Sequence, residues 1–146
     1  MSSDSRIPVI LSGARTPFGR FRGALSPLSA SDLGAHAIRA ALQRAGVSAA
    51  QIEFVIVGQV IQAGAGQGPA RQASLGAGIG WDVPTVTVNK LCLSGLTAVI
   101  DAGRMIRAGE ADFVVAAGQE SMTNARTSSK GCALGSSSAT HPWSTR

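Results

Sequence analysis

The sequence is poor in several residue types, and each shortage excludes a class of protein. Of its 146 residues only two are cysteine, aromatic residues make up 4% with no tyrosine, and charged residues make up 14%. Two cysteines are too few for a disulfide scaffold. The low aromatic content disfavours an aromatic-rich β-barrel, and no apolar run approaches the ~20 residues of a membrane span. The N-terminus also lacks the regions of a secretion signal, so we expect a cytoplasmic protein with no membrane partner.

The excess of positive charge is confined to one end of the chain. Residues 1–125 contain ten Lys/Arg and eight Asp/Glu, a balance of +2, whereas residues 126–146 contain three Lys/Arg and no acidic residue. Nucleic-acid binding favours a basic face with interleaved aromatic residues. The first 125 residues show neither feature, so we expect no nucleic-acid partner, while an acidic small ligand stays compatible with the sequence.

The apolar pattern predicts an α/β fold. Short apolar runs typical of strands occupy residues 7–11, 54–58, 84–89 and 113–118. Helical spacing of apolar residues occupies 33–45, 69–77 and 92–108, and Ser29 or Ser31 could cap the first of these helices. This alternation predicts a βαβαβαβ arrangement with a largely parallel sheet over residues 1–125. Residues 126–146 hold six serines and no valine or isoleucine, and we expect them to be a disordered tail.

The residue best placed for chemistry is Cys92, where the third predicted strand turns into the longest predicted helix. The positive end of a helix dipole favours a thiolate, and the free backbone N–H groups there can hold an oxyanion formed when the thiolate attacks a carbonyl. The alternative is an inert buried cysteine, which position alone favours.

The sequence around Cys92 favours a nucleophile over an inert cysteine. Residues 88–98 (VNKLCLSGLTA) closely resemble the nucleophile motif of the thiolases, the acetyl-CoA acetyltransferase family. Three further segments resemble motifs of the same family in the same order. They are residues 15–19 (RTPFG), 62–72 (QAGAGQGPARQ) and 116–124 (AAGQESMTN). Two positions depart from the family pattern, because Gly68 replaces the usual asparagine and Ala117 the usual glycine.

The resemblance implies a ping-pong acyl transfer. Cys92 would take an acyl group from an acyl-CoA as a thioester, with its own backbone N–H as an oxyanion donor, and a second acetyl-CoA carbanion would collect it. The reverse reaction cleaves a 3-ketoacyl-CoA. Coenzyme A and acetyl-CoA are then substrates, with no permanently bound cofactor, and the parent family implies a homo-oligomer.

The resemblance covers only the N-terminal half of the layered thiolase fold. The thiolase segments Asn-Glu-Ala-Phe and Gly-His-Pro, and the second catalytic cysteine motif, have no counterpart here. Neither His36 nor His141 nor Cys132 matches a family motif, and none is assigned a role. We therefore expect this chain to be inactive by itself and to associate through apolar surface. The alternative is a non-enzymatic half-domain that binds a full-length thiolase.

The unpatterned tail suggests a frameshift. Residues 125–145 can be back-translated so that an offset frame resembles the thiolase segment expected there. Our hypothesis is that a natural or sequencing frameshift replaced the family sequence with residues 126–146.

Other candidate sites are weaker. The glycines of residues 64–68 suggest a dinucleotide-binding loop, but the last glycine of that motif falls on Pro69. We expect Arg15, Arg20 and Arg22 to lie on a solvated loop rather than to bind a phosphate. The acidic residues Asp101, Glu110, Asp112 and Glu120 show no metal-ligand clustering.

Overall fold

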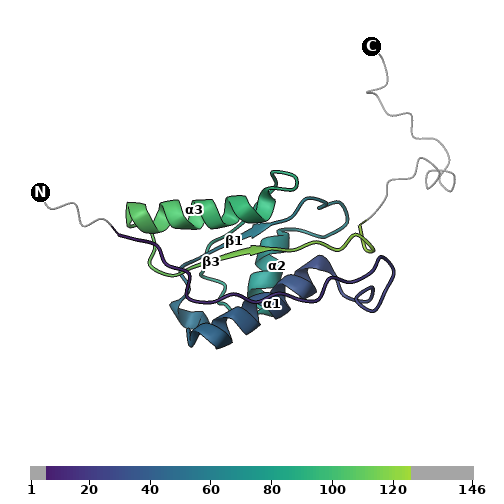
Figure 1. Cartoon of the computed structure of the whole chain (residues 1–146), viewed down its shortest axis with the longest axis horizontal. Coiled ribbons are helices and arrows are strands. Elements are labelled where there is room, and N and C mark those ends of the chain that lie inside the picture. Colours follow the sequence, from purple (N-terminus) through teal and green to yellow (C-terminus); the bar gives the residue numbers. More distant parts are fainter. Residues whose placement is uncertain (1–5, 126–146) are drawn as a thin grey trace, which may run out of the picture.

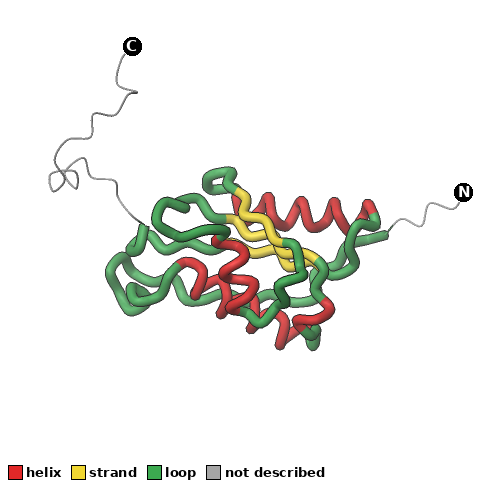
Figure 2. Tube along the Cα trace, turned by 180° about the vertical axis from the view of Figure 1, so that it is seen from behind, coloured by secondary structure: helices red, strands yellow, loops and turns green. Residues whose placement is uncertain are grey.

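The computed structural model describes residues 6–125, which form a small parallel sheet covered by helices on both faces (Figures 1 and 2). The strands are β1 (Phe54–Gly58), β2 (Thr85–Val88) and β3 (Val114–Gly118), in the order β2-β1-β3. β1 pairs in parallel with both neighbours. The predicted α/β class and three of the four predicted strands are therefore confirmed.

The helices divide between the two faces of the sheet. In Figure 1, α1 (Ala30–Ala45) and α2 (Pro69–Gly76) lie below the sheet and α3 (Ser94–Ala108) lies above it; a 3-10 turn, η1 (Ala49–Gln51), precedes β1. Alternate residues of β1 serve the two sides, as the pleat of a strand requires. Val55 and Val57 belong to the core cluster shared with α1 and α2, whereas Ile56 packs with Ala98 and Ala102 of α3.

Local sequence signals fix the helix ends. The hydroxyl of Ser29 accepts the N–H of Asp32 at the start of α1, and the Asp32 carboxylate accepts the N–H of Ser29 in return, which is a capping box. Gly46 and Gly109 end α1 and α3 with φ values of 67° and 72°. A left-handed residue lets the backbone leave a helix while bonding its last carbonyls, and glycine adopts that conformation without strain.

The prediction of a first strand over residues 7–11 is wrong. This segment pairs with no strand, and Ile7 and Ile10 are 80% and 84% exposed. It lines an apolar cavity of about 660 Å³ together with residues 112–116 and parts of α1 and α3. β3 hydrogen-bonds to β1 alone within residues 6–125, so its outer edge has no paired strand. An apolar run becomes a strand only when its backbone hydrogen-bonds to a neighbouring strand, and residues 7–11 form no such ladder within residues 6–125.

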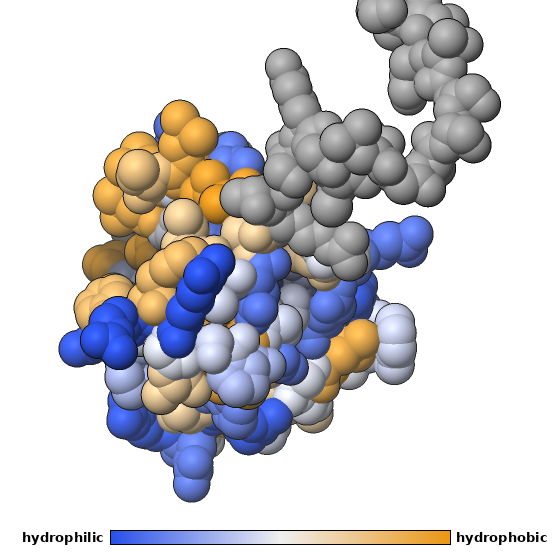
Figure 3. Space-filling view, turned by 90° about the vertical axis from the view of Figure 1, so that its right-hand side faces the viewer, coloured by the Kyte–Doolittle hydropathy of each residue, from blue (hydrophilic) through white to orange (hydrophobic). Residues whose placement is uncertain are grey.

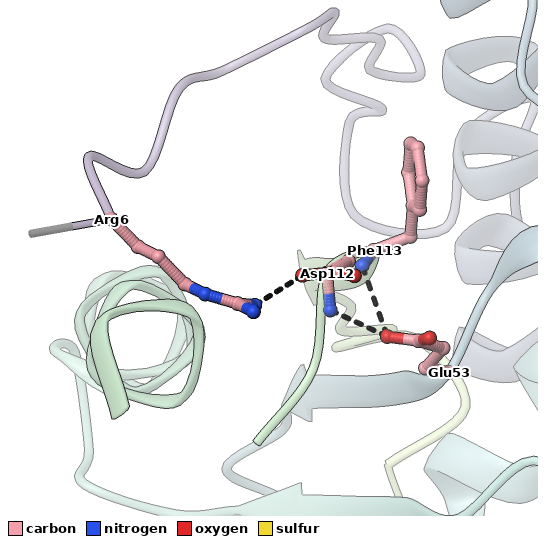
Figure 4. A network of polar contacts seen from close by, with 4 residues as sticks. All are labelled: Arg6, Glu53, Asp112 and Phe113. Atoms are coloured by element: carbon pink, nitrogen blue, oxygen red, sulfur yellow. Dashed lines mark hydrogen bonds and ion pairs between the residues drawn. The ribbon is translucent and has the colours of Figure 1, made fainter. Parts of the chain in front are cut away.

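A polar network closes the amino end of the sheet (Figure 4). One carboxylate oxygen of Glu53 accepts the N–H groups of Asp112 (2.5 Å) and Phe113 (3.3 Å), and Arg6 forms an ion pair with Asp112 at 2.5 Å. Glu53 precedes β1 and Phe113 precedes β3. The network therefore joins the starts of two neighbouring strands and ties the N-terminal segment to them.

The predicted disordered tail of residues 126–146, with His141 and Cys132, lies outside the residues that the structure describes. Across residues 6–125, no helix has the length and apolar character needed to cross a membrane.

Candidate active site

A cavity of about 620 Å³ opens at the carboxyl ends of β1 and β3. Ligands of parallel α/β sheets bind at this end of the strands. Its walls come from the strand ends Gly58 and Gly118, the turn that leads into α3, and residues 14–21. Cys92 is one of the lining residues, and it is exposed. The structure thus places the predicted nucleophile in a solvent-open cavity at the expected end of the sheet, and not in the apolar core.

The position of Cys92 differs in one respect from the prediction. α3 begins at Ser94, so Cys92 lies in the turn before the helix and not in its first turn. Leu93, the residue that precedes the helix, makes no side-chain capping bond. The N-terminal end of α3 is therefore stabilised by other groups in the turn.

Two side chains hold that turn. The hydroxyl of Ser94 accepts the N–H of Lys90 at 2.8 Å and donates to the carbonyl of Leu91 at 2.6 Å. The side-chain carbonyl of Asn89 accepts the N–H of Leu91 at 3.1 Å, and its amide donates to the carbonyl of Val60 at 2.9 Å. Leu91 has a φ of 51°, in the left-handed region that a branched residue rarely adopts. The side-chain bonds stabilise this unusual backbone conformation.

The hydrogen bonds of the turn leave the Cys92 amide without an acceptor among residues 6–125. The N–H groups of Leu93 and Ser94 donate to the carbonyls of Lys90 (3.1 Å) and Leu91 (3.0 Å), and the Lys90 and Leu91 N–H groups go to the two side chains just described. The N–H of Cys92 finds no acceptor in the part of the chain that the structure describes, and neither do the N–H groups of Gly95 and Leu96 in the first turn of α3. A free N–H on the same residue as the thiol is the group that the predicted oxyanion contact requires.

α3 approaches the sheet so closely that Gly58 has no room for a Cβ. A Cβ on Gly58 would lie 2.5 Å from the Ser94 carbonyl carbon and 2.6 Å from the Gly95 nitrogen, and a Cβ on Gly118 would lie 3.5 Å from the Gly95 Cα. The backbone of the Cys92 turn therefore rests directly on the ends of β1 and β3. The sequence did not identify Gly58 and Gly118 as residues of the site. The only sequence signal is that each is the last residue of a strand.

Buried glutamines lie beneath the cavity. The Gln119 amide donates to the side-chain carbonyl of Gln59 at 2.8 Å, and the Gln59 amide donates to the carbonyl of Ile61 at 3.0 Å. Gln59 is 2% exposed and Gln119 7% exposed. The Glu120 carboxylate accepts the N–H of Val60 at 2.8 Å. These residues extend from the ends of β1 and β3 and link the two strands across the cavity floor.

Two of the weaker candidates, Arg15 and Arg20, line the cavity together with Cys92, whereas Arg22 does not. Arg15, Arg20 and Arg22 are exposed on the loop before α1, and two of them lie over phenylalanine rings, Arg15 on Phe18 and Arg22 on Phe21. His36 is exposed on α1.

The glycine-rich loop before α2 binds a side chain of the helix that follows it. The Gln72 amide donates to the carbonyls of Ala65 (2.9 Å) and Gln67 (3.0 Å). This contact gives the loop a structural explanation that needs no phosphate. Among residues 6–125, no group of three or more His, Cys, Asp or Glu side chains is placed to hold a metal ion.

Comparisons with known proteins agree on one family. A family model described as the thiolase N-terminal domain matches residues 8–142. The chain belongs to the thiolase family. It is 62% identical over 117 residues to a probable acetyl-CoA acetyltransferase of Mycobacterium leprae and 54% identical over 117 residues to an acetyl-CoA acetyltransferase of Cupriavidus necator. Each match covers 80% of this chain.

A solved thiolase has the same fold. A crystal structure of the Acat5 thiolase from Ascaris suum in complex with coenzyme A superposes with a TM-score of 0.79 at 44% identity, over 80% of this chain and 31% of that one. The 146-residue thiolase chain spans only about 30% of the length of the two acetyltransferases as well. The comparisons therefore confirm an N-terminal thiolase segment.

Proposed function

We propose that this chain is the nucleophile-bearing N-terminal part of a thiolase-type acyl-CoA acyltransferase. The observation that carries the proposal is Cys92, whose exposed thiol and backbone N–H, unpaired within residues 6–125, belong to one residue on the wall of a cavity of about 620 Å³. Supporting it, matching relatives are named acetyl-CoA acetyltransferases, and a similar thiolase has been solved with coenzyme A.

The proposed step is transfer of an acyl group to sulfur. The Cys92 thiolate attacks the carbonyl carbon of an acyl-CoA, and the electron pair of the C=O bond moves onto oxygen. The Cys92 N–H stabilises that oxyanion until it collapses and the carbon–sulfur bond to CoA breaks, with CoA leaving as a thiolate. The second step, attack by an acetyl-CoA carbanion on the enzyme thioester, needs a base for the α-proton. No described residue near Cys92 is proposed for that role.

We therefore expect the isolated chain to become acylated on Cys92 but not to complete the catalytic cycle. These 146 residues span about 30% of the length of their relatives, and we propose that the groups needed for the second step come from the part of a thiolase that they do not cover. The helix that follows Cys92 also exposes Leu96 (55%), Val99 (43%) and Ile100 (41%), and Figure 3 shows hydrophobic surface toward the side where α3 lies. Exposed apolar surface of this kind favours association. We propose negligible turnover and a tendency to self-associate.

The test is the mass of the chain after incubation with acetyl-CoA. One acetyl group should be added, peptide mapping should place it on Cys92, and Cys92→Ser should abolish it while Cys132→Ser should not. An unmodified chain, or an acetyl group elsewhere, would overturn the assignment of Cys92. Sustained exchange of acetyl groups between CoA molecules would instead contradict the proposed lack of turnover.

A second candidate function rests on the apolar face of α3. A half-domain that binds a full-length thiolase would use that face and would not need the thiol. Co-expression with a full-length thiolase distinguishes the two: this candidate requires a defined hetero-complex that survives Cys92→Ser and is lost in Ile100→Lys. Absence of such a complex would leave acyl transfer as the function.

A further inference from the structure

We infer that Ser94 is a positioning residue whose hydroxyl holds the Cys92 backbone N–H in place for the oxyanion. This inference deepens the proposed acyl transfer and depends on it for its biological meaning. Ser94 is 4% exposed, and its hydroxyl closes the turn by accepting the Lys90 N–H and donating to the Leu91 carbonyl. Neither bond involves Cys92, but both join residues before Cys92 to a residue after it.

The backbone of the turn needs this support. Leu91 is held in the left-handed region at a φ of 51°, which costs a non-glycine residue free energy. Its N–H goes to the Asn89 side chain and its carbonyl accepts both the hydroxyl and the N–H of Ser94. Losing the hydroxyl removes one of these restraints on Leu91 and, at the same time, the acceptor of the Lys90 N–H. The peptide between Leu91 and Cys92 could then rotate toward a relaxed conformation, and that peptide carries the Cys92 N–H.

The same helix offers a matched control. The hydroxyl of Thr97 is buried but makes no hydrogen bond among the residues described. Thr97→Val therefore removes a buried hydroxyl from the first turn of α3 without removing a hydrogen bond. Ser94→Ala removes a hydroxyl that makes two. Any difference between these variants reports on the turn and not on the loss of a buried oxygen as such.

The experiment compares two reactions of one thiol in the full 146-residue chain. All variants carry Cys132→Ser, because Cys132 is the only other cysteine. p-Nitrophenyl acetate acetylates Cys92 through a tetrahedral oxyanion, whose collapse breaks the bond to p-nitrophenolate. Iodoacetamide alkylates the same sulfur by direct displacement of iodide, with no oxyanion. The ratio of the two rate constants cancels changes in thiolate fraction and in access, and it needs no CoA binding.

The expected result is a fall in that ratio by about tenfold in Ser94→Ala and no change in Thr97→Val, in keeping with the 10²–10³-fold loss when an oxyanion donor is removed altogether. Asn89→Ala, at an exposed position on the other side of the turn, should lower the ratio in the same direction and serves if Ser94→Ala does not fold. A ratio unchanged in Ser94→Ala, or in Asn89→Ala if only that variant folds, would overturn the inference.

The outcomes for the two proposals are separate. A wild-type chain that reacts with both reagents but not with acetyl-CoA contradicts the proposed function and still decides the role of Ser94. A chain acetylated by acetyl-CoA whose reagent ratio ignores Ser94→Ala supports the function and rejects the positioning role.

Discussion

The two faces of the sheet are covered to different extents. On the side of α1 and α2, nine buried residues form one core cluster, whereas three form the cluster on the α3 side. α3 itself carries apolar residues on two faces: Ala98 and Ala102 are buried against β1, while Val99 and Ile100 remain more than 40% exposed. A helix that is apolar on two sides is built to be buried on both. Within residues 6–125, the α1 and α2 side of the sheet is therefore well covered, whereas the outer face of α3 has little cover.

A matched pair of isoleucines tests this difference most directly. Ile38 on α1 is 2% exposed and Ile100 on α3 is 41% exposed. Ile38→Ala should lower the free energy of unfolding by about 3 kcal/mol, because it opens a cavity in a packed core. Ile100→Ala should cost less, about 1 kcal/mol, because the residue is already 41% exposed and its truncation opens no enclosed cavity. Chemical denaturation of both variants measures the two values, and equal losses would contradict the comparison.

The contact between the two sides can be broken at Gly58. A Cβ there would lie 2.5 Å from the backbone of Ser94, so Gly58→Ala must push α3 and the Cys92 turn away from the sheet. We expect a loss of about 2 kcal/mol, as for other overpacked sites, together with slower acetylation of Cys92. Gly13→Ala, where a Cβ would meet nothing within 4 Å, is the control and should leave both quantities unchanged. Normal stability in Gly58→Ala would show that the contact is looser than described.

The amino end of the sheet tests how far polar contacts secure the α3 side. Glu53→Gln keeps the shape of the side chain but removes the charge that accepts the Asp112 and Phe113 N–H groups. The expected loss is about 1 kcal/mol, because these are charge-assisted bonds at an exposed position. Glu110→Gln is the control, because the Glu110 side chain forms no hydrogen bond within residues 6–125. The same small effect in both variants would mean that the network contributes nothing specific.

The smallest effect is expected at the cap of α1, on the well-covered side. Hydrogen bonds from the Ser29 hydroxyl and then from the Ser29 N–H lower the pKa of Asp32 from its ordinary value of 3.8. Asp32 therefore stabilises the fold above that value, and the contribution is lost as the pH falls through the lowered pKa. Asp32→Asn should cost about 0.5 kcal/mol near neutral pH, the lower range for a helix cap.

The pH dependence is the sharper part of that test. The stability difference between wild type and Asp32→Asn should be constant near neutrality and shrink below 3.8. It is measured by denaturation at a series of pH values. A difference that grows as the pH falls would have the wrong sign and would reject the explanation.

Local signals made most of the fold predictable. Ser29, Asp32 and Gly46 define α1 through capping and left-handed termination, both of which depend on a few adjacent residues. The β1 strand follows from its continuous apolar run. The departure at Gly68 is also local: its φ of 56° suits glycine, and asparagine, the family residue, is among the few others that tolerate it.

The candidate site was predictable in part. Cys92 and its family motif were evident from the sequence, but the roles of Ser94, Asn89 and Gly58 were not. Their importance comes from hydrogen bonds within a turn that is not regular structure and from a backbone contact between residues far apart in the chain. No periodicity reports such contacts, because each depends on how α3 approaches the ends of two strands.

The sequence by itself determined the helices, three strands, the family and the identity of the predicted nucleophile, since each rests on a local pattern or a contiguous motif. Only the tertiary structure decided that residues 7–11 are not a strand and that Cys92 lies exposed before α3, with no acceptor for its N–H among the described residues. The physical reason is the same in both cases. A strand forms only when a segment distant in sequence pairs with its backbone groups. Whether an N–H is unpaired depends likewise on the positions of all the acceptors around it.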